Sequence, residues 1–184
     1  MRRLILACAL LAACTTELPA PNGLFPSYRN AAAPFSSIAL FDPARYAGTW
    51  YEIARYPVPF QRGCVGTMAQ YTLRPDGTLG VLNTCRDGAL DGPVKQIEGS
   101  ARLVGPGRLE VRFESVPFLS APYWVLWVDE GYRTAVVGVP SGRAGWILNR
   151  DPQIPSDRLA AAREILDFNG YDLSRLLMVP QDSR

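Results

Sequence analysis

A succession of short segments with alternating apolar and polar residues most strongly constrains how this chain can fold. In RLEVRFES (108–115), Leu109, Val111 and Phe113 fall on one face of an extended chain, and charged residues fall on the other. Turn sequences separate such segments; in RPDG (74–77), Pro fixes φ at the first corner and Gly takes the left-handed position. The pattern predicts strands at about 48–56, 64–73, 78–86, 93–103, 107–115, 121–129, 132–139 and 145–150.

These sequential strands leave two architectures open. Eight antiparallel strands joined by short turns can close into an up-and-down barrel, whose interior holds side chains or one small ligand. A sandwich with a filled core would show the same alternation. The 16 Gly and 16 Pro residues agree with either, because both architectures need many turns.

One helix is expected after the last of these strands. Ser156 or Asp157 can cap its start, and Asn169-Gly170 can end it. A short strand is expected at 174–179. The helix would carry an apolar stripe at helical spacing, formed by Leu159, Ala162, Ile165 and Leu166.

The composition argues against several classes of function. The chain has no histidine, which removes the usual general base and the commonest transition-metal ligand, so no catalytic residue, metal site or cofactor is assigned. Lys and Arg number 19 against 17 Asp and Glu, and Arg2 and Arg3 account for the difference. A nearly neutral chain without a basic run is a poor candidate for binding nucleic acid.

Residues 1–14, MRRLILACALLAAC, have the layout of a secretory signal that is too short to span a bilayer. The end of this segment resembles the lipobox of bacterial lipoproteins, in which the cysteine is lipidated and becomes the first mature residue. The resemblance implies a lipid on Cys14 and sorting to the outer membrane, since Thr15 rather than Asp follows. A plain signal peptide that happens to carry a cysteine is the alternative.

The segment after Cys14 predicts the domain organisation. From Thr15 to about Ser37 the chain is rich in Ala, Pro, Ser and Asn with little periodicity, which is typical of a tether. We therefore expect a signal peptide at 1–13, a lipidated N-terminus and tether at 14–37, and one folded domain at 38–184.

Export would leave an even pair of cysteines. Cys8 would leave with the signal and Cys14 would carry the lipid, so Cys64 and Cys85 would meet an oxidising compartment together. The RPDG turn folds the third segment back on the second and brings the two cysteines close to opposite each other. One slip or bulge would align them, so we expect a Cys64–Cys85 disulfide, with two reduced cysteines as the alternative.

Three motifs resemble the conserved regions of the lipocalins. GTWYEIAR (48–55) resembles the first, Gly-x-Trp, and VDEGYRTAVV (128–137) the second, although Val-Asp-Glu replaces the usual Thr-Asp-Tyr. WILNRDP (146–152) resembles the third. Further segments between about 41 and 180 resemble the group containing bacterial outer-membrane lipocalins and apolipoprotein D. The resemblance implies an all-β fold: an eight-stranded antiparallel up-and-down β-barrel with one C-terminal α-helix packed outside.

The resemblance also implies structural roles for three residues. In lipocalins the Trp of the first region closes one end of the barrel, and the Arg of the third region lies across its indole. These positions are Trp50 and Arg150 here. Gly48 would let the backbone turn into the first strand.

Alternation, set in register by the family pattern, predicts which residues point into the barrel. Glu52 follows Trp50 by two residues and so falls on the same face of the strand. A buried carboxylate needs a partner, and Arg55, Arg102 or a tyrosine would serve. The inward set is largely apolar and aromatic, as in a site for an apolar ligand, although the same side chains could simply fill the barrel. The expected ligand-binding residues are Ala69, Tyr71, Val81, Asn83, Ile97, Val111, Phe113, Tyr123, Val125, Trp127 and Trp146.

These features favour a membrane-anchored lipid-binding protein rather than an enzyme. Its partners would be a fatty acid or lysophospholipid, held for storage or transport, and the outer membrane reached through the lipid anchor. The alternatives are a lipocalin-like enzyme acting on a lipid and a structural envelope lipoprotein with a filled barrel. A monomer and a homodimer are both compatible with these features.

Overall fold

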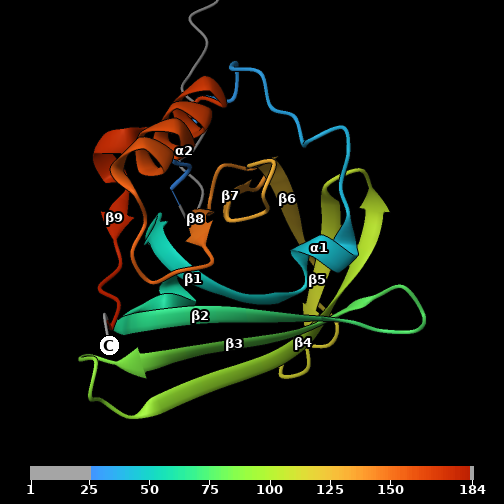
Figure 1. The fold of residues 1–184 in the computed structure, drawn as a ribbon, viewed down its shortest axis with the longest axis vertical. Coiled ribbons are helices and arrows are strands. Elements are labelled where there is room, and N and C mark those ends of the chain that lie inside the picture. Colours follow the sequence, from blue (N-terminus) through green and yellow to red (C-terminus); the bar gives the residue numbers. More distant parts are fainter. Residues whose placement is uncertain (1–25, 183–184) are drawn as a thin grey trace, which may run out of the picture.

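The computed structural model describes residues 26–182 as one antiparallel barrel with a helix outside it (Figure 1). Each strand pairs with the next along the chain, and β1 pairs with both β2 and β8, which closes the barrel. The predicted fold class is confirmed. The eight barrel strands are β1 (Gly48–Arg55), β2 (Cys64–Leu73), β3 (Leu79–Asp87), β4 (Val94–Gly105), β5 (Arg108–Phe113), β6 (Ala121–Val128), β7 (Thr134–Gly138) and β8 (Gly145–Asn149).

The two ends of the barrel differ. A short helix, α1 (Pro43–Tyr46), leads directly into β1 and marks the closed end. The opposite, open end is formed by four loops at 56–63, 88–93, 114–120 and 139–144, and the first of them contains the 3-10 helix η1 (Pro59–Gln61). At the closed end the RPDG turn forms as predicted, with Gly77 at φ +80.

Register shifts occur in four strand pairs, and those in β1 and β6 change the direction of side chains discussed below. In β1 the pairing with β8 shifts between Glu52 and Ala54, so Arg55 lies on the same side as Glu52. In β6 the pairing with β7 shifts between Val125 and Trp127. A bulge adds one residue to one strand, and every side chain beyond it changes face relative to strict alternation.

The helix α2 (Ser156–Phe168) packs outside the barrel against β6 and β7 (Figure 1). Ala162 and Leu166 are fully buried there, and Leu159 and Ile165 are partly buried, as the predicted stripe requires. The predicted cap is wrong: Pro155 holds the N-cap position, and no side chain caps the helix. Among residues 26–182, no helix is both long enough and apolar enough to cross a membrane.

The C-terminal segment returns to the barrel after α2. A second 3-10 helix, η2 (Leu173–Arg175), is followed by β9 (Leu177–Met178), which pairs with the end of β1. This two-residue strand lies within the short strand expected at 174–179. Gln181 then donates hydrogen bonds to the carbonyls of Glu52 and Thr67, which fastens the chain end across β1 and β2.

The segment 26–37, which the sequence analysis assigns to the tether, packs against the domain. Tyr28 is buried, and its backbone N–H bonds the carbonyl of Gly142. Phe35 stacks on Trp124, with ring centroids 5.2 Å apart. Residues 26–37 therefore contact the domain expected at 38–184. The expected signal, Cys14 and the first part of the tether lie outside the described residues.

Candidate functional site

The closed end is built around Trp50. Its side chain is fully buried, and its indole N–H donates to the carbonyl of Tyr46 at 2.8 Å. The guanidinium of Arg150 lies 3.9 Å from the centre of the indole. Gly48 has φ +100, and a Cβ there would lie 3.1 Å from Arg150, so the bend into β1 favours glycine.

Arg150 also donates hydrogen bonds to backbone carbonyls at the end of α1. It donates to the carbonyls of Arg45, Ala47 and Thr49, each at 2.8 Å. One planar guanidinium thus covers an aromatic face and bonds several otherwise unpaired carbonyls. These contacts hold this end of the barrel shut.

Side chains fill the lower part of the barrel. The phenol oxygens of Tyr46 and Tyr123 lie 2.7 Å apart, and Tyr71 donates to Tyr123 at 2.9 Å. Burial raises the pKa of Tyr71 to about 12 and the pKa values of Tyr46 and Tyr123 well above their usual range, so all three are neutral. Other buried members of this cluster include Leu79, Val81, Ala101, Leu109, Val111, Val125, Val137 and Leu148.

The structure places most of the predicted wall residues in or against this interior cluster. Tyr71, Val81, Val111 and Val125 are buried members, and Ala69, Phe113, Tyr123 and Trp146 pack against them. Asn83 is paired in register with Ala69, and its buried Oδ1 has no hydrogen-bond partner within residues 26–182. Ile97 pairs in register with Asn83 and is 36% exposed.

Trp127 does not point into the barrel. It packs instead with Leu126 and Leu166 in the cluster that joins the barrel to α2. The prediction failed because strict alternation from Tyr123 and Val125 ignores the bulge that follows Val125. Val128 takes the inward place beyond the bulge.

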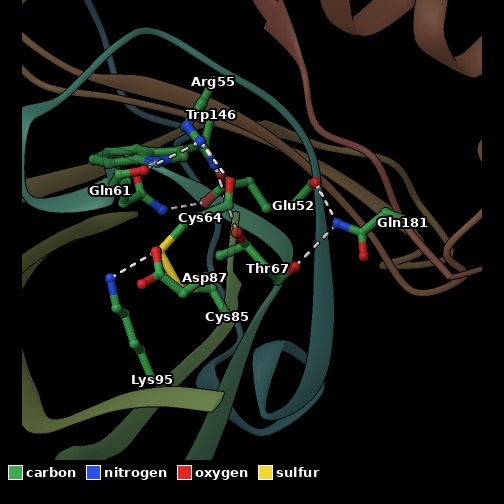
Figure 2. Close-up of a disulfide and its surroundings, with 10 residues drawn as sticks. All are labelled: Glu52, Arg55, Gln61, Cys64, Thr67, Cys85, Asp87, Lys95, Trp146 and Gln181. Atoms are coloured by element: carbon green, nitrogen blue, oxygen red, sulfur yellow. Dashed lines mark hydrogen bonds and ion pairs between the residues drawn. A yellow bond between two sulfur atoms is a disulfide. The ribbon is translucent and has the colours of Figure 1, made fainter. Parts of the chain in front are cut away.

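A polar cluster lies inside the barrel just below the open end (Figure 2). Glu52 is 5% exposed and accepts from Arg55 and from the amide of Gln61, both at 2.7 Å. Gln61 in turn accepts from the indole N–H of Trp146 at 3.1 Å. Of the partners considered for Glu52, the structure selects Arg55, while Arg102 pairs with Glu110 on the surface.

The same contacts set the charge state of Glu52. Burial raises the pKa of this carboxyl above its ordinary value of 4.5, and the hydrogen bonds from Arg55 and Gln61 partly oppose that rise. Sequence reasoning missed Gln61, because a loop glutamine carries no periodic signal. Its effect is to fasten the loop at 56–63 over the barrel interior.

The expected Cys64–Cys85 disulfide is formed, with both cysteines buried (Figure 2). In register Cys64 opposes Asp87, two residues beyond Cys85, so the bond runs diagonally between β2 and β3. Beside it, Lys95 forms an ion pair with Asp87 at 2.8 Å. The open ends of β2, β3 and β4 are therefore cross-linked next to the polar cluster.

A pocket of about 740 Å³, lined in part by Gln61 and by the loops at 56–63 and 139–144, is called the mouth pocket here. This volume lies within the usual range for small-molecule sites, roughly 300–1,000 Å³. Of the predicted wall residues only Trp146 lines it. The lining consists of Pro26, Tyr28, Arg55, Pro57, Val58, Pro59, Phe60, Gln61, Arg62, Gly63, Ala121, Pro122, Val139, Ser141, Arg143, Ala144, Trp146 and Leu177.

A barrel shut at one end by Trp50 and Arg150 and open at the other is the arrangement that the sequence motifs implied. Residues 41–181 match the family described as Lipocalin-like domain. The chain belongs to the lipocalin family. Proteins of this family are generally non-catalytic and bind small hydrophobic ligands.

Three relatives show how far this lipocalin resembles known members. It is 41% identical over 147 residues to temperature-induced lipocalin-1 of Arabidopsis thaliana, covering 74% of this chain and 77% of that protein. It is 36% identical over 154 residues to apolipoprotein D of Macaca fascicularis, covering 78% of each. It is 33% identical over 176 residues to the outer membrane lipoprotein Blc of Escherichia coli K12, covering 95% and 92%.

Proposed function

We propose that this lipocalin is a lipid-binding protein of the cell envelope, anchored to the outer membrane through a lipid on Cys14. It holds a fatty acid, a lysophospholipid or a similar apolar ligand for storage or transport. The mouth pocket carries this proposal: it is large enough for such a ligand, and its wall is mainly apolar.

Two observations support the anchor. The sequence LAAC (11–14) ends a short apolar run as a lipobox does. The relative named outer membrane lipoprotein Blc aligns with 95% of this chain, far beyond the barrel alone. A chain attached in this way would keep the pocket beside the membrane that supplies or receives the ligand.

The ligand would enter the mouth pocket and extend past Gln61 into the barrel. Gln61 sits on a loop, and rotation of its side chain alone would break the bonds to Glu52 and Trp146 while its backbone stays bonded to Arg55 and Val58. Below it, the proposed wall for the deeper part of the ligand consists of Ala69, Tyr71, Val81, Asn83, Ile97, Val111, Phe113, Tyr123 and Val125.

Titration with fatty acids and lysophospholipids tests the proposal through Trp146, the indole that lines the pocket. Tryptophan emission should change and saturate at one ligand per chain. A Trp146→Phe variant should lose most of the change, whereas Trp127→Phe, outside the barrel, should keep it. If no lipid gives a saturable change and calorimetry also detects no binding, the proposal is wrong.

A second candidate is favoured by the packing inside the barrel. The Tyr46, Tyr71 and Tyr123 hydroxyls bond one another, and apolar side chains surround them. A structural envelope lipoprotein with a filled barrel would have such an interior. The two functions differ in the titration, because a filled barrel gives no saturable binding.

A further inference from the structure

The charged residues that line the mouth pocket are all arginines, and the nearby carboxylate of Glu52 is paired with one of them, Arg55. Arg55, Arg62 and Arg143 belong to its lining, and none of the described residues that line it is an Asp or Glu. The remaining wall is mostly apolar. An apolar cavity edged by positive charge alone attracts anions more strongly than neutral ligands.

The three arginines are not equivalent. Arg55 is already engaged, with Glu52 at 2.7 Å and the carbonyl of Cys64 at 2.8 Å. Arg62 and Arg143 are exposed, and within residues 26–182 neither side chain forms a hydrogen bond or an ion pair. Each therefore keeps all of its guanidinium donors for a ligand.

Packing fixes the two loops that carry these arginines. Val58, from the loop of Arg62, packs with Val139 and Ala144, from the loop of Arg143. The two loops thus form one edge of the pocket, with the indole of Trp146 packed beneath them. An amphiphile whose polar head binds at this edge would place its apolar chain against the pocket wall.

We infer that the mouth pocket binds an anionic amphiphile, with a single carboxylate or phosphate held by Arg62 and Arg143 and the apolar chain against Trp146 and the pocket wall. Guanidinium groups match both anions, because their paired N–H donors fit two oxygens at once. The inference rests on the proposed function and deepens it by specifying that the polar head group of the ligand is anionic.

Binding of amphiphiles with matched chains tests this inference. The protein is the full mature chain carrying Cys14→Ser, so that no attached lipid competes. The probes are dodecanoate, dodecyl phosphate and uncharged dodecanol below their micellar concentrations, with binding measured by calorimetry. The test variant carries both Arg62→Gln and Arg143→Gln. The matched control is Arg112→Gln, because Arg112 is an exposed arginine on β5 outside the pocket.

The double variant should bind the two anionic probes about tenfold more weakly, which two partly exposed ion pairs can supply. Dodecanol affinity should not change, and the Arg112 variant should behave like the parent. Added salt should weaken anion binding to the parent and have little effect on the double variant. A difference between dodecanoate and dodecyl phosphate identifies which anion is preferred.

Two results overturn the inference. If the parent binds dodecanol as tightly as the anions, or if the double variant loses affinity for all three probes equally, the arginines do not recognise charge, although lipid binding itself stands. If no probe binds the parent, both the inference and the proposed function are wrong.

Discussion

Arg150 and Trp50 act as one unit at the closed end. The cation–π contact alone contributes about 0.5–2 kcal/mol, according to its exposure. The guanidinium also bonds carbonyls at the end of α1, so its removal would leave both the indole face and those carbonyls exposed. Neither side chain lines the mouth pocket. We therefore expect both side chains to act in stability rather than in ligand contact.

Trp50→Ala should lower the free energy of unfolding by about 3–5 kcal/mol, since it removes a fully buried indole. Urea denaturation measures this. Trp124→Ala is a matched control, because Trp124 is also covered by an arginine, Arg108 at 4.3 Å, but is only partly buried. Its replacement should lower the free energy of unfolding by less. Unchanged stability together with lost lipid binding in Trp50→Ala would place Trp50 in the ligand site instead.

Glu52 gives the stability of the fold a pH dependence of definite sign. Its pKa is raised in the folded state, so the unfolded chain releases this proton first as the pH rises. The contribution of Glu52 to stability is therefore greatest below its ordinary pKa of 4.5 and declines as the pH rises from there through the folded pKa.

Glu52→Gln removes this titration. The free energy of unfolding of the parent minus that of the variant should decrease as the pH rises from the ordinary pKa of 4.5 through the folded pKa. Denaturation at a series of pH values measures the difference and cancels the titration of other groups. An increase across the same range would mean that the ion pair with Arg55 outweighs burial, contrary to our account.

Among the elements, the β2–β3 hairpin is the one most firmly constrained at the open end. The Cys64–Cys85 bond joins its ends, and Arg55 bonds the carbonyl of Cys64. Through that carbonyl, the disulfide also supports the loop that carries Gln61. Loss of the bond should loosen the rim of the pocket as well as the hairpin.

Replacing both Cys64 and Cys85 by Ser should lower the free energy of unfolding by about 3 kcal/mol in the chain-entropy view. Denaturation with and without reductant provides the measurement. Reductant should bring the parent close to the variant and leave the variant unchanged. Two alkylated thiols on non-reduced protein from the envelope would show that the bond is absent there.

The positions of the strands could be predicted because alternating apolar and polar residues mark each strand and turn residues mark its ends. The bulges at β1 and β6 could not, since an extra residue in one strand leaves no mark in composition; Trp127 was misplaced for this reason. Gln61 was missed because its bonds to Glu52 and Trp146 join distant segments. The packing of residues 26–37 could not be predicted, because no periodic pattern in the sequence marks the backbone hydrogen bonds that hold much of this segment.

In the proposed function, the molecule combines a barrel that has one open end with a lipid anchor at Cys14. Cys14→Ser should therefore release the protein from the outer membrane or leave its signal uncleaved. Membrane fractionation and the mass of the mature chain report these outcomes. A variant that still fractionates with the outer membrane as the parent does would show that Cys14 is not the anchor.

We propose that the barrel carries a lipid in the cell. Native mass spectrometry of the chain, purified gently from its own envelope, tests whether a lipid is bound there. We predict an added mass equal to one fatty acid or lysophospholipid, which is lost on mild activation and restored when that lipid is added back. A bare chain that also takes up no lipid on addition would contradict the claim and favour the filled barrel.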